Sequence, residues 1–385
     1  MKKNFLPVVV TCLIVAMTVT NCSKDNTLSK NDQIGGDKLK SGATITSVVC
    51  AWNSTFVIKS DATLWAVGEN DSGILGTGDN VERHSFVQVL TNVKTVAASS
   101  DFCLALKRDG TVWATGQNLN GEFGNGTNTG SNTFIQVASN IKAIAVGKLH
   151  SMILNNNAVL LTSGSNTFGQ LGTGDNTDRN VFTQVLINAD RISAGSWNSY
   201  AKMGNTSLFS TGLNDTYQLG TGDFTDRNRF VKVINGGVAD VAGAFSGNQC
   251  FALMTNGALQ VVGDNSSGEL GTGDNNVRTR FTQLISSNVS SASIGGATFI
   301  KLYFPVNQLK CTGVNLNGEL GLGDNNNRNA FTVAVPGNVT SFSCGAKHTF
   351  FVKSDGSLWA TGSNLFGQLG TGNTNDTNSF VNVTF

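Results

Sequence analysis

The sequence predicts an all-β fold built from seven copies of one unit. Each copy carries a Gly-x-Asn motif, and a Phe follows eighteen residues after its glycine. The intervals between successive copies are 48 to 51 residues, and the glycines are Gly68, Gly116, Gly164, Gly212, Gly263, Gly313 and Gly362. Units of this length that hold four short strands are typical of ring-shaped β architectures. The expected fold is a seven-bladed β-propeller of four-stranded blades.

Each unit contains four short segments with strand character. In the second copy they are residues 94–98, 102–107, 111–115 and 134–137, and Asp109-Gly110 predicts the hairpin turn between the middle two. The long loop after the third strand is rich in glycine, which permits positive φ and close approach of the chain. A phosphate-binding loop is disfavoured because it needs a following helix N-terminus, and no segment has helical periodicity.

The N-terminal residues predict export and lipid attachment. Lys2 and Lys3 precede an apolar stretch from Phe5 to Val19 that is short for a membrane-spanning helix. Cys22 follows this stretch, and the arrangement resembles a bacterial lipoprotein signal, in which the cysteine becomes the lipidated first residue. Ordinary cleavage near a free Cys22 is the alternative. Residues 1–21 are therefore interpreted as a signal peptide, 22–43 as a flexible tether and 44–385 as the propeller.

Composition restricts the function classes. The chain has 26 basic and 25 acidic residues, a net charge of +1, which gives no reason to expect a nucleic-acid or anionic-membrane partner. Three scattered histidines offer little material for catalysis or a metal cluster, no Cys-x-x-Cys occurs, and no cofactor is expected. The cysteines of the repeat region are interpreted as small buried hydrophobic residues; they are Cys50, Cys103, Cys250, Cys311 and Cys344.

The pattern GxNxxGQLGxG, preceded by a strand pair, resembles the repeat of the regulator of chromosome condensation family. Residues 343–373, SCGAKHTFFVKSDGSLWATGSNLFGQLGTGN, follow the family pattern almost throughout. The resemblance extends over all seven copies and implies a seven-bladed ring. Phe stands at the start of the fourth strand, where many members have Pro. The closure of the ring stays open, because the units are complete and leave no strand over at either end.

An Asp and an Arg four residues later occur together in five copies and are absent together in two. This pattern predicts a salt bridge that pins each long loop, with a bidentate geometry as one option. A calcium site or an arginine clamp for a substrate is the functional alternative. The predicted pairs are Asp79–Arg83, Asp175–Arg179, Asp223–Arg227, Asp274–Arg278 and Asp324–Arg328.

The turns between the first two strands of each unit are the candidate binding site. Antiparallel strands place these turns on the same face as the long loops, around the mouth of the central channel. The turns vary between copies and are rich in aromatic residues, which in clusters usually indicate contact with a partner. Plugging of the channel by the same rings is the alternative. The proposed contact residues are Trp52, Asp101, Phe102, Lys148, Leu149, Trp197, Phe245, Phe299 and Lys347.

Two further features belong to single copies. The fifth copy has three extra residues, placed around residues 244–249. His150 and His348 occupy the same repeat position, fourteen residues before the glycine. A role in packing and hydrogen bonding is favoured for both over catalysis, because no catalytic constellation accompanies them.

The leading functional hypothesis is a lipid-anchored, monomeric binding module without chemistry of its own. It would hold a protein or a glycan at a bacterial cell envelope, with a lipid as its only membrane contact. Inhibition of a secreted enzyme is the second hypothesis, because the resemblance includes bacterial propellers that inhibit β-lactamases. Guanine-nucleotide exchange, the activity of the founding member, is disfavoured because a secretion signal separates the chain from cytosolic GTPases. An enzyme is the least favoured alternative.

Overall fold

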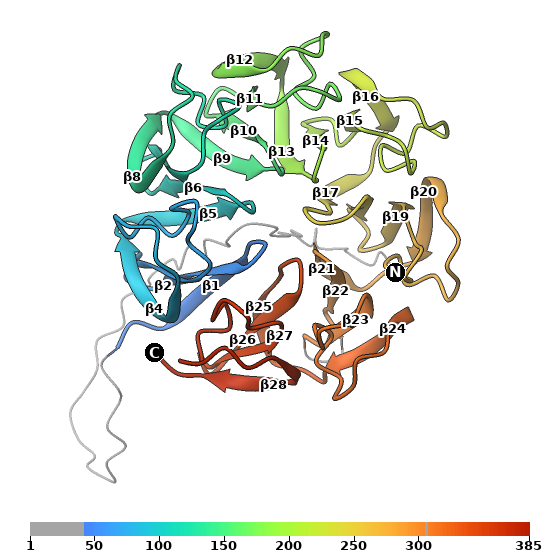
Figure 1. Ribbon diagram of the computed structural model, residues 1–385. Coiled ribbons are helices and arrows are strands. Elements are labelled where there is room, and N and C mark those ends of the chain that lie inside the picture. The colour runs from blue at the N-terminus through green and yellow to red at the C-terminus, as the bar shows by residue number, and fades with distance from the viewer. Residues whose placement is uncertain (1–41, 305–306) are drawn as a thin grey trace, which may run out of the picture.

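The computed structural model describes residues 42–304 and 307–385, which form a ring of seven antiparallel four-stranded sheets (Figure 1). The predicted all-β, seven-bladed propeller is confirmed. The predicted signal peptide and residues 22–41 of the tether, including Cys22, lie outside the described residues. The described part contains no helix that could span a membrane.

Four consecutive strands make each blade, from the innermost to the outermost. The innermost strands are β1 (Ile45–Cys50), β5 (Val93–Ala98), β9 (Ile141–Val146), β13 (Ala189–Ala194), β17 (Val238–Gly243), β21 (Val289–Ile294) and β25 (Val339–Cys344). The second strands are β2 (Ser54–Lys59), β6 (Phe102–Lys107), β10 (His150–Asn155), β14 (Asn198–Met203), β18 (Gln249–Met254), β22 (Ala297–Leu302) and β26 (His348–Lys353). The third strands are β3 (Leu64–Gly68), β7 (Val112–Gly116), β11 (Val159–Gly164), β15 (Leu208–Gly212), β19 (Leu259–Gly263), β23 (Leu309–Gly313) and β27 (Leu358–Gly362). The outermost strands are β4 (Arg83–Leu90), β8 (Ser131–Ala138), β12 (Arg179–Ile187), β16 (Arg227–Ile234), β20 (Arg278–Ile285), β24 (Arg328–Val335) and β28 (Thr377–Val383).

The ring closes without an exchanged strand. Blade 1 is β1–β4 and blade 7 is β25–β28, and both sheets are built from consecutive strands like the other five. Strand β1 packs directly against β25 and β26. The question that the sequence left open is therefore answered, because the last boundary is held by side-by-side packing of two complete blades.

Every boundary between blades uses the repeated Phe and a loop glycine. The Phe of one blade lies against a glycine in the long loop of the preceding blade, so closely that a Cβ on Gly76 would lie 2.5 Å from the ring of Phe134. The same contact recurs at all seven boundaries and includes Phe86 against Gly370 where blade 7 meets blade 1. The Phe thus packs neighbouring blades together, which explains its presence in every copy.

The hydrophobic core lies between adjacent blades. The second strands are buried along almost their whole length, because blades cover them on both faces; β6, for example, is buried from Phe102 to Leu106. The five cysteines of the described residues are all buried and free, which confirms their interpretation as small hydrophobic residues. The outermost strands β4 and β16 consist of half-buried and exposed residues, with none fully buried.

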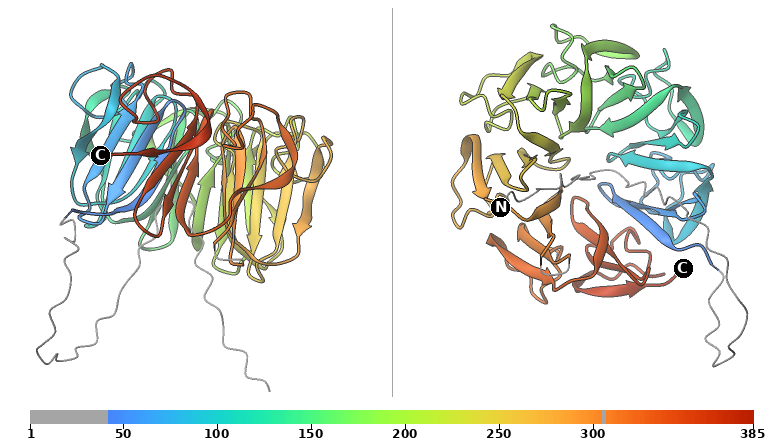
Figure 2. Two further views of the ribbon diagram at one scale, coloured as in Figure 1. Left: turned by 90° about the horizontal axis from the view of Figure 1, so that it is seen from below. Right: turned by 180° about the vertical axis from the view of Figure 1, so that it is seen from behind.

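The strand directions give the ring two different faces. The loop face carries the turns between first and second strands together with the long loops after the third strands. The hairpin face carries the turns between second and third strands. The described chain begins on the hairpin face, where Thr44 N–H donates to Ser60 Oγ (3.1 Å) and Ser60 N–H donates to the Thr44 carbonyl (2.8 Å). Figure 2 (left) shows this start, in blue, at the lower face of the disc.

Candidate functional site on the loop face

A buried asparagine organises each long loop of this face. In blade 3, Asn166 is fully buried, and its Oδ1 accepts the Leu171 N–H (2.9 Å). Its Nδ2 donates to the carbonyls of Asp175 (2.9 Å) and Thr177 (3.2 Å). The equivalent asparagines accept a backbone N–H five residues later in all seven copies. The Gly-x-Asn motif is thus a loop clamp that holds the face in shape.

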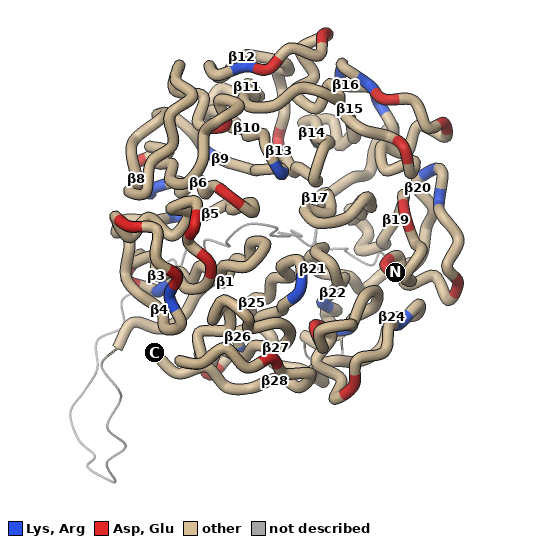
Figure 3. The backbone as a smooth tube through the Cα atoms, viewed as in Figure 1, with Lys and Arg blue, Asp and Glu red and all other residues tan. Residues whose placement is uncertain are grey.

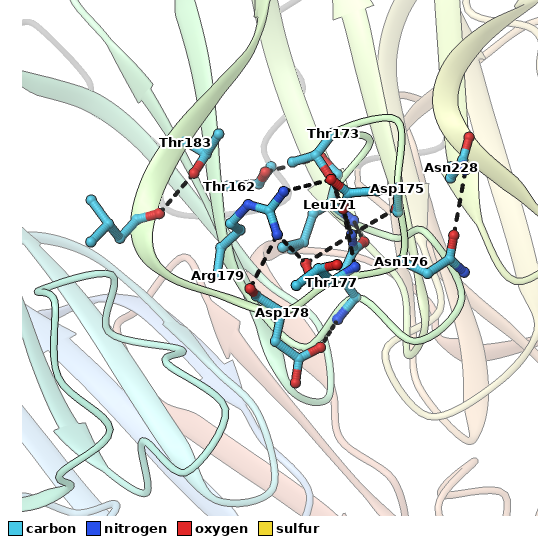
Figure 4. Close-up of polar contacts among 12 residues, drawn as sticks. Thr162, Leu171, Thr173, Asp175, Asn176, Thr177, Asp178, Arg179, Thr183 and Asn228 are labelled. Carbon is cyan, nitrogen blue, oxygen red and sulfur yellow. Dashed lines mark hydrogen bonds and ion pairs between the residues drawn. The ribbon is translucent and has the colours of Figure 1, made fainter.

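All five Asp–Arg pairs are present and lie on the same loops. In blade 3, Arg179 Nη2 lies 2.6 Å from Asp175 Oδ2, and Nη1 donates to the Thr177 carbonyl (2.7 Å; Figure 4). The bidentate option is wrong, because one guanidinium nitrogen binds the carboxylate and the other binds the main chain. The remaining distances are 2.6 Å for Arg83–Asp79, 2.7 Å for Arg227–Asp223, 2.9 Å for Arg278–Asp274 and 2.6 Å for Arg328–Asp324.

The hydrogen-bond acceptors of these carboxylates are occupied by donors from the same loop. The Arg83 hydrogen bond, assisted by Thr77, lowers the pKa of Asp79 to about 2, and the pKa values of the other four are lowered as well. Asp175 Oδ1 additionally accepts from Thr177 N–H (3.0 Å) and Thr173 Oγ1 (3.1 Å). Each pair therefore has a structural role within its own loop.

Aromatic rings from distant blades meet at the mouth of the channel. Trp52 of blade 1 and Phe245 of blade 5 make an edge-to-face contact with ring centroids 5.9 Å apart. Phe168 packs edge-to-face on Trp197 at 5.5 Å. Lys148 Nζ lies 5.9 Å from the Trp52 ring and 5.3 Å from the Trp197 ring, which links the two pairs. All five side chains are half-buried, so this rim cluster keeps part of its surface accessible.

The other proposed contact residues divide into two groups. Asp101 and Leu149 are half-buried and Lys347 is exposed on the same face. Phe102 and Phe299 are fully buried at the start of β6 and within β22, where they pack into the cores between blades. Their placement on the rim is corrected, because the turn ends before Phe102 and Phe299 lies inside its strand.

The long turn of blade 5 allows the cross-ring contact. Five residues, 244–248, connect β17 and β18, whereas three residues make the equivalent turn in blade 1. The third extra residue lies elsewhere, in the connection before Val238, which corrects the expectation that all three belong to this turn. Phe245 also lines the cavity of about 160 Å³ in the centre of the ring, whose other walls are residues of the innermost strands and Lys301 of β22.

The two histidines of the repeat join neighbouring blades. His348 is fully buried, and its Nε2 lies 2.9 Å from Thr55 Oγ1 of blade 1. Because that hydroxyl donates to the Gln368 carbonyl (2.9 Å), the imidazole Nε2–H is the donor. His150 makes the same contact with Ser199 of blade 4 (2.9 Å). Burial lowers the pKa of His348 to about 3 and that of His150 to about 4, as for neutral structural imidazoles.

Two buried glutamates lie in the long loops of a face on which acidic residues outnumber basic ones. Glu122 and Glu319 are nearly inaccessible, and each accepts a backbone N–H two residues earlier, from Asn120 (2.9 Å) and Asn317 (2.7 Å). Burial raises the pKa values of both carboxyl groups. Across the described residues, the half of each strand nearer the loop face, together with the loops of that face, carries seventeen Asp and Glu against nine Lys and Arg. Figure 3 marks the charged positions of the whole ring.

A motif on the opposite face escaped the sequence analysis. Lys-x-Asp-x-Thr-x-Trp spans the hairpins of blades 1 and 2, and blade 7 has Ser in place of Thr. In blade 1, Asp61 accepts from the Thr63 hydroxyl (2.7 Å), Thr63 accepts from Trp65 Nε1 (2.9 Å), and Lys59 Nζ lies 4.0 Å from the Trp65 ring. The alternation of these residues at every second position was the available signal.

Comparison with known proteins identifies the repeat and the fold. The model of the regulator of chromosome condensation (RCC1) repeat matches residues 93–122 and 339–368. A search of curated proteins found no match. Human WBSCR16 is 18% identical over 84% of this chain and 94% of its own, with a TM-score of 0.71. Yeast RCC1 (Prp20), solved with Kap60 bound, is 19% identical over 89% and 75%, with a TM-score of 0.56. The ectodomain of the Physcomitrella patens receptor kinase CR4 is 13% identical over 83% and 74%, with a TM-score of 0.50. At these identities the similarity to solved structures concerns the fold.

Proposed function

We propose that this seven-bladed propeller, in which residues 93–122 and 339–368 match the RCC1 repeat, is a binding module whose loop face holds a protein or glycan partner. The rim cluster is the observation that carries this proposal. Amphipathic aromatic rings at the centre of a rigid face are the usual anchors of interfaces, since they bury large areas at a small cost in entropy.

The surroundings of the rim cluster define the partner further. Burial raises the pKa values of Glu69 and Glu122, and the negative charge of Asp101 beside the rim raises both further. An acidic rim around an aromatic centre favours a partner surface that carries positive charge. The loop clamps hold these groups in place before binding, so little ordering entropy opposes the association.

We place this module at a bacterial cell envelope, attached through lipid on Cys22. The apolar segment before Cys22 and the polar residues after it support this location. The described chain starts on the hairpin face, so a tether from there leaves the loop face directed away from the membrane.

A pull-down from envelope extract tests the binding face. The chain carrying Trp52→Ala and Trp197→Ala is compared with wild type and with Trp113→Ala/Trp359→Ala, which removes two half-buried tryptophans from the opposite face. We expect wild type and the Trp113/Trp359 variant to capture the same partner and the rim variant to lose it. Circular dichroism and urea unfolding establish that all three are folded. Equal capture by all three, or no specific partner of the wild type, would refute the rim as the site, and competition by soluble oligosaccharide would identify a glycan.

A further inference from the structure

The hairpin face carries exposed or half-buried aromatic side chains on four neighbouring blades, 6, 7, 1 and 2, and basic side chains on three of them. These blades are neighbours because blade 7 packs on blade 1. The Lys-x-Asp-x-Thr/Ser-x-Trp hairpins contribute Trp359, Trp65 and Trp113, each with a lysine Nζ at 4.0 to 4.5 Å from its ring. Phe385, half exposed at the end of the chain, packs on Trp65 with centroids 5.7 Å apart. We call this set, together with Phe304 of blade 6, the hairpin arc.

Phe304 is the most exposed of the large hydrophobic side chains of the described residues. Its accessible fraction is 77%, at the tip of the blade 6 hairpin. Asn288 holds its backbone from both sides, because Phe304 N–H donates to Oδ1 (3.0 Å) and Nδ2 donates to the Phe304 carbonyl (2.7 Å). A side chain presented this way on an anchored backbone projects its ring into the medium beyond the face.

Charge separates the two faces of the ring, although the whole chain is nearly neutral. Within the described residues, the hairpin half carries eleven Lys and Arg against five Asp, the reverse of the acidic loop half. Arg108 is exposed in the arc itself, so its three Lys-x-Asp hairpins carry four basic residues against three exposed acidic ones, Asp61, Asp109 and Asp355. The balanced composition therefore conceals a basic face and an acidic face, which a total over the sequence could not reveal.

We propose that the hairpin arc docks on the surface of an anionic phospholipid bilayer. This inference rests on the envelope location proposed above, and it adds a second membrane contact to the lipid expected from the sequence. The described chain starts in blade 1, within the arc, so a lipid-anchored tether would deliver this face to the membrane. Tryptophan and lysine are the side chains that suit the boundary between headgroups and water, since each has an apolar body and a polar end. Each basic residue near an anionic surface adds attraction that salt screens.

Vesicle co-sedimentation without lipid on the protein tests this contact. The contacts that hold the blades lie within the described residues, so a chain that starts at residue 22 and carries Cys22→Ser keeps them. It is mixed with vesicles of phosphatidylcholine and phosphatidylglycerol, or of phosphatidylcholine alone. The arc variant is Arg108→Glu with Phe304→Ser. The matched control, Lys347→Glu with Leu365→Ser, makes the same kinds of change at exposed positions of the loop face.

We expect the Cys22→Ser chain to bind the mixed vesicles and to lose this binding in high salt. The arc variant should bind on the order of tenfold more weakly, since reversal of one charge removes an attraction and adds a repulsion. The control should bind like the parent chain. Absence of a preference for phosphatidylglycerol, or an equal loss in arc variant and control, would overturn the proposal. Neither result bears on partner capture by the rim cluster, so the two proposals fail separately.

Discussion

Replacement of His348 by Gln should make the free energy of unfolding less dependent on pH in the acid range, because one titrating group is removed. His348 is buried between blades 7 and 1, and its pKa falls from an ordinary 6.5 to about 3. The unfolded chain therefore takes up a proton near pH 6.5 that the folded chain refuses until about pH 3. Above pH 6.5 His348 therefore does not reduce the stability of the fold, and below pH 6.5 it reduces the stability progressively as the pH falls.

The size of the effect follows from the pKa difference. Each pH unit below 6.5 costs about 1.4 kcal/mol for one such group, so this imidazole removes roughly 2 kcal/mol of stability at pH 5 relative to neutral pH. Gln occupies the same repeat position in blade 5, as Gln249, and it retains an N–H that can donate to Thr55. At pH 7 we therefore expect the variant to differ from wild type by no more than about 1 kcal/mol.

Urea unfolding followed by tryptophan fluorescence at pH 7, 6 and 5 measures this difference. Other groups with shifted pKa values, such as Asp240, contribute equally to both proteins and cancel. The control is His84→Asn, because His84 lies beside Glu82 (2.9 Å) and against Gly367 of blade 7, a place that Asn132 takes against Gly73 at the next boundary. Parallel stability curves for His348→Gln and wild type would refute the reasoning, since they would mean that His348 takes up its proton in the folded ring as well.

Two further perturbations test the loop clamp and the boundary between blades. Asn166→Ala leaves the Leu171 N–H and the carbonyls of Asp175 and Thr177 without their partner, so we expect a loss of about 3 kcal/mol or more in urea unfolding, against less than about 1 kcal/mol for the exposed Asn176→Ala. Gly370→Ala places a Cβ 2.5 Å from the Phe86 ring at φ +66°, whereas Gly372→Ala (φ +78°) meets nothing nearer than Ser85 Oγ at 3.8 Å. The first should lose roughly 2–4 kcal/mol and the second about 1 kcal/mol in thermal or urea unfolding, and equal losses would show that backbone strain, not the Phe contact, dominates.

The repeat made the fold predictable, because agreement between seven copies separates structural positions from variable ones. The Asp–Arg pairs were found in this way, since the two residues occur and disappear together. The role of the repeated Phe was not accessible, because Phe86 contacts Gly370, which lies in a different copy at the other end of the chain. Periodicity within a copy carries no information about such contacts between copies.

The candidate site was predictable only in part, because the turns differ between copies. Comparing the seven copies therefore does not show which turn residues face the surface. Trp52 and Phe245 were identified as rim residues, but their mutual contact depends on a longer turn and on the curvature of the ring. The sequence does not distinguish Phe102 and Phe299 from the rim aromatic residues. The strands start one or two residues earlier than the rim assignment assumed, so both rings lie in the core. The charge separation between the two faces depends on the direction of each strand, because the direction decides which face the residues at its ends lie on.

Complete blades have a consequence for how the chain can be cut. The boundary between blades 7 and 1 is the one place where no peptide bond links neighbours, yet it repeats the Phe–Gly packing found at the other six. The described chain starts in blade 1, where Thr44 is bonded to Ser60, and it ends after β28 of blade 7 with Phe385 packed on Trp65 of blade 1. A circular permutant that joins these ends and opens the connection between β8 and β9 should therefore fold to the same ring. Its termini, and with them any membrane anchor, would move to another part of the circumference.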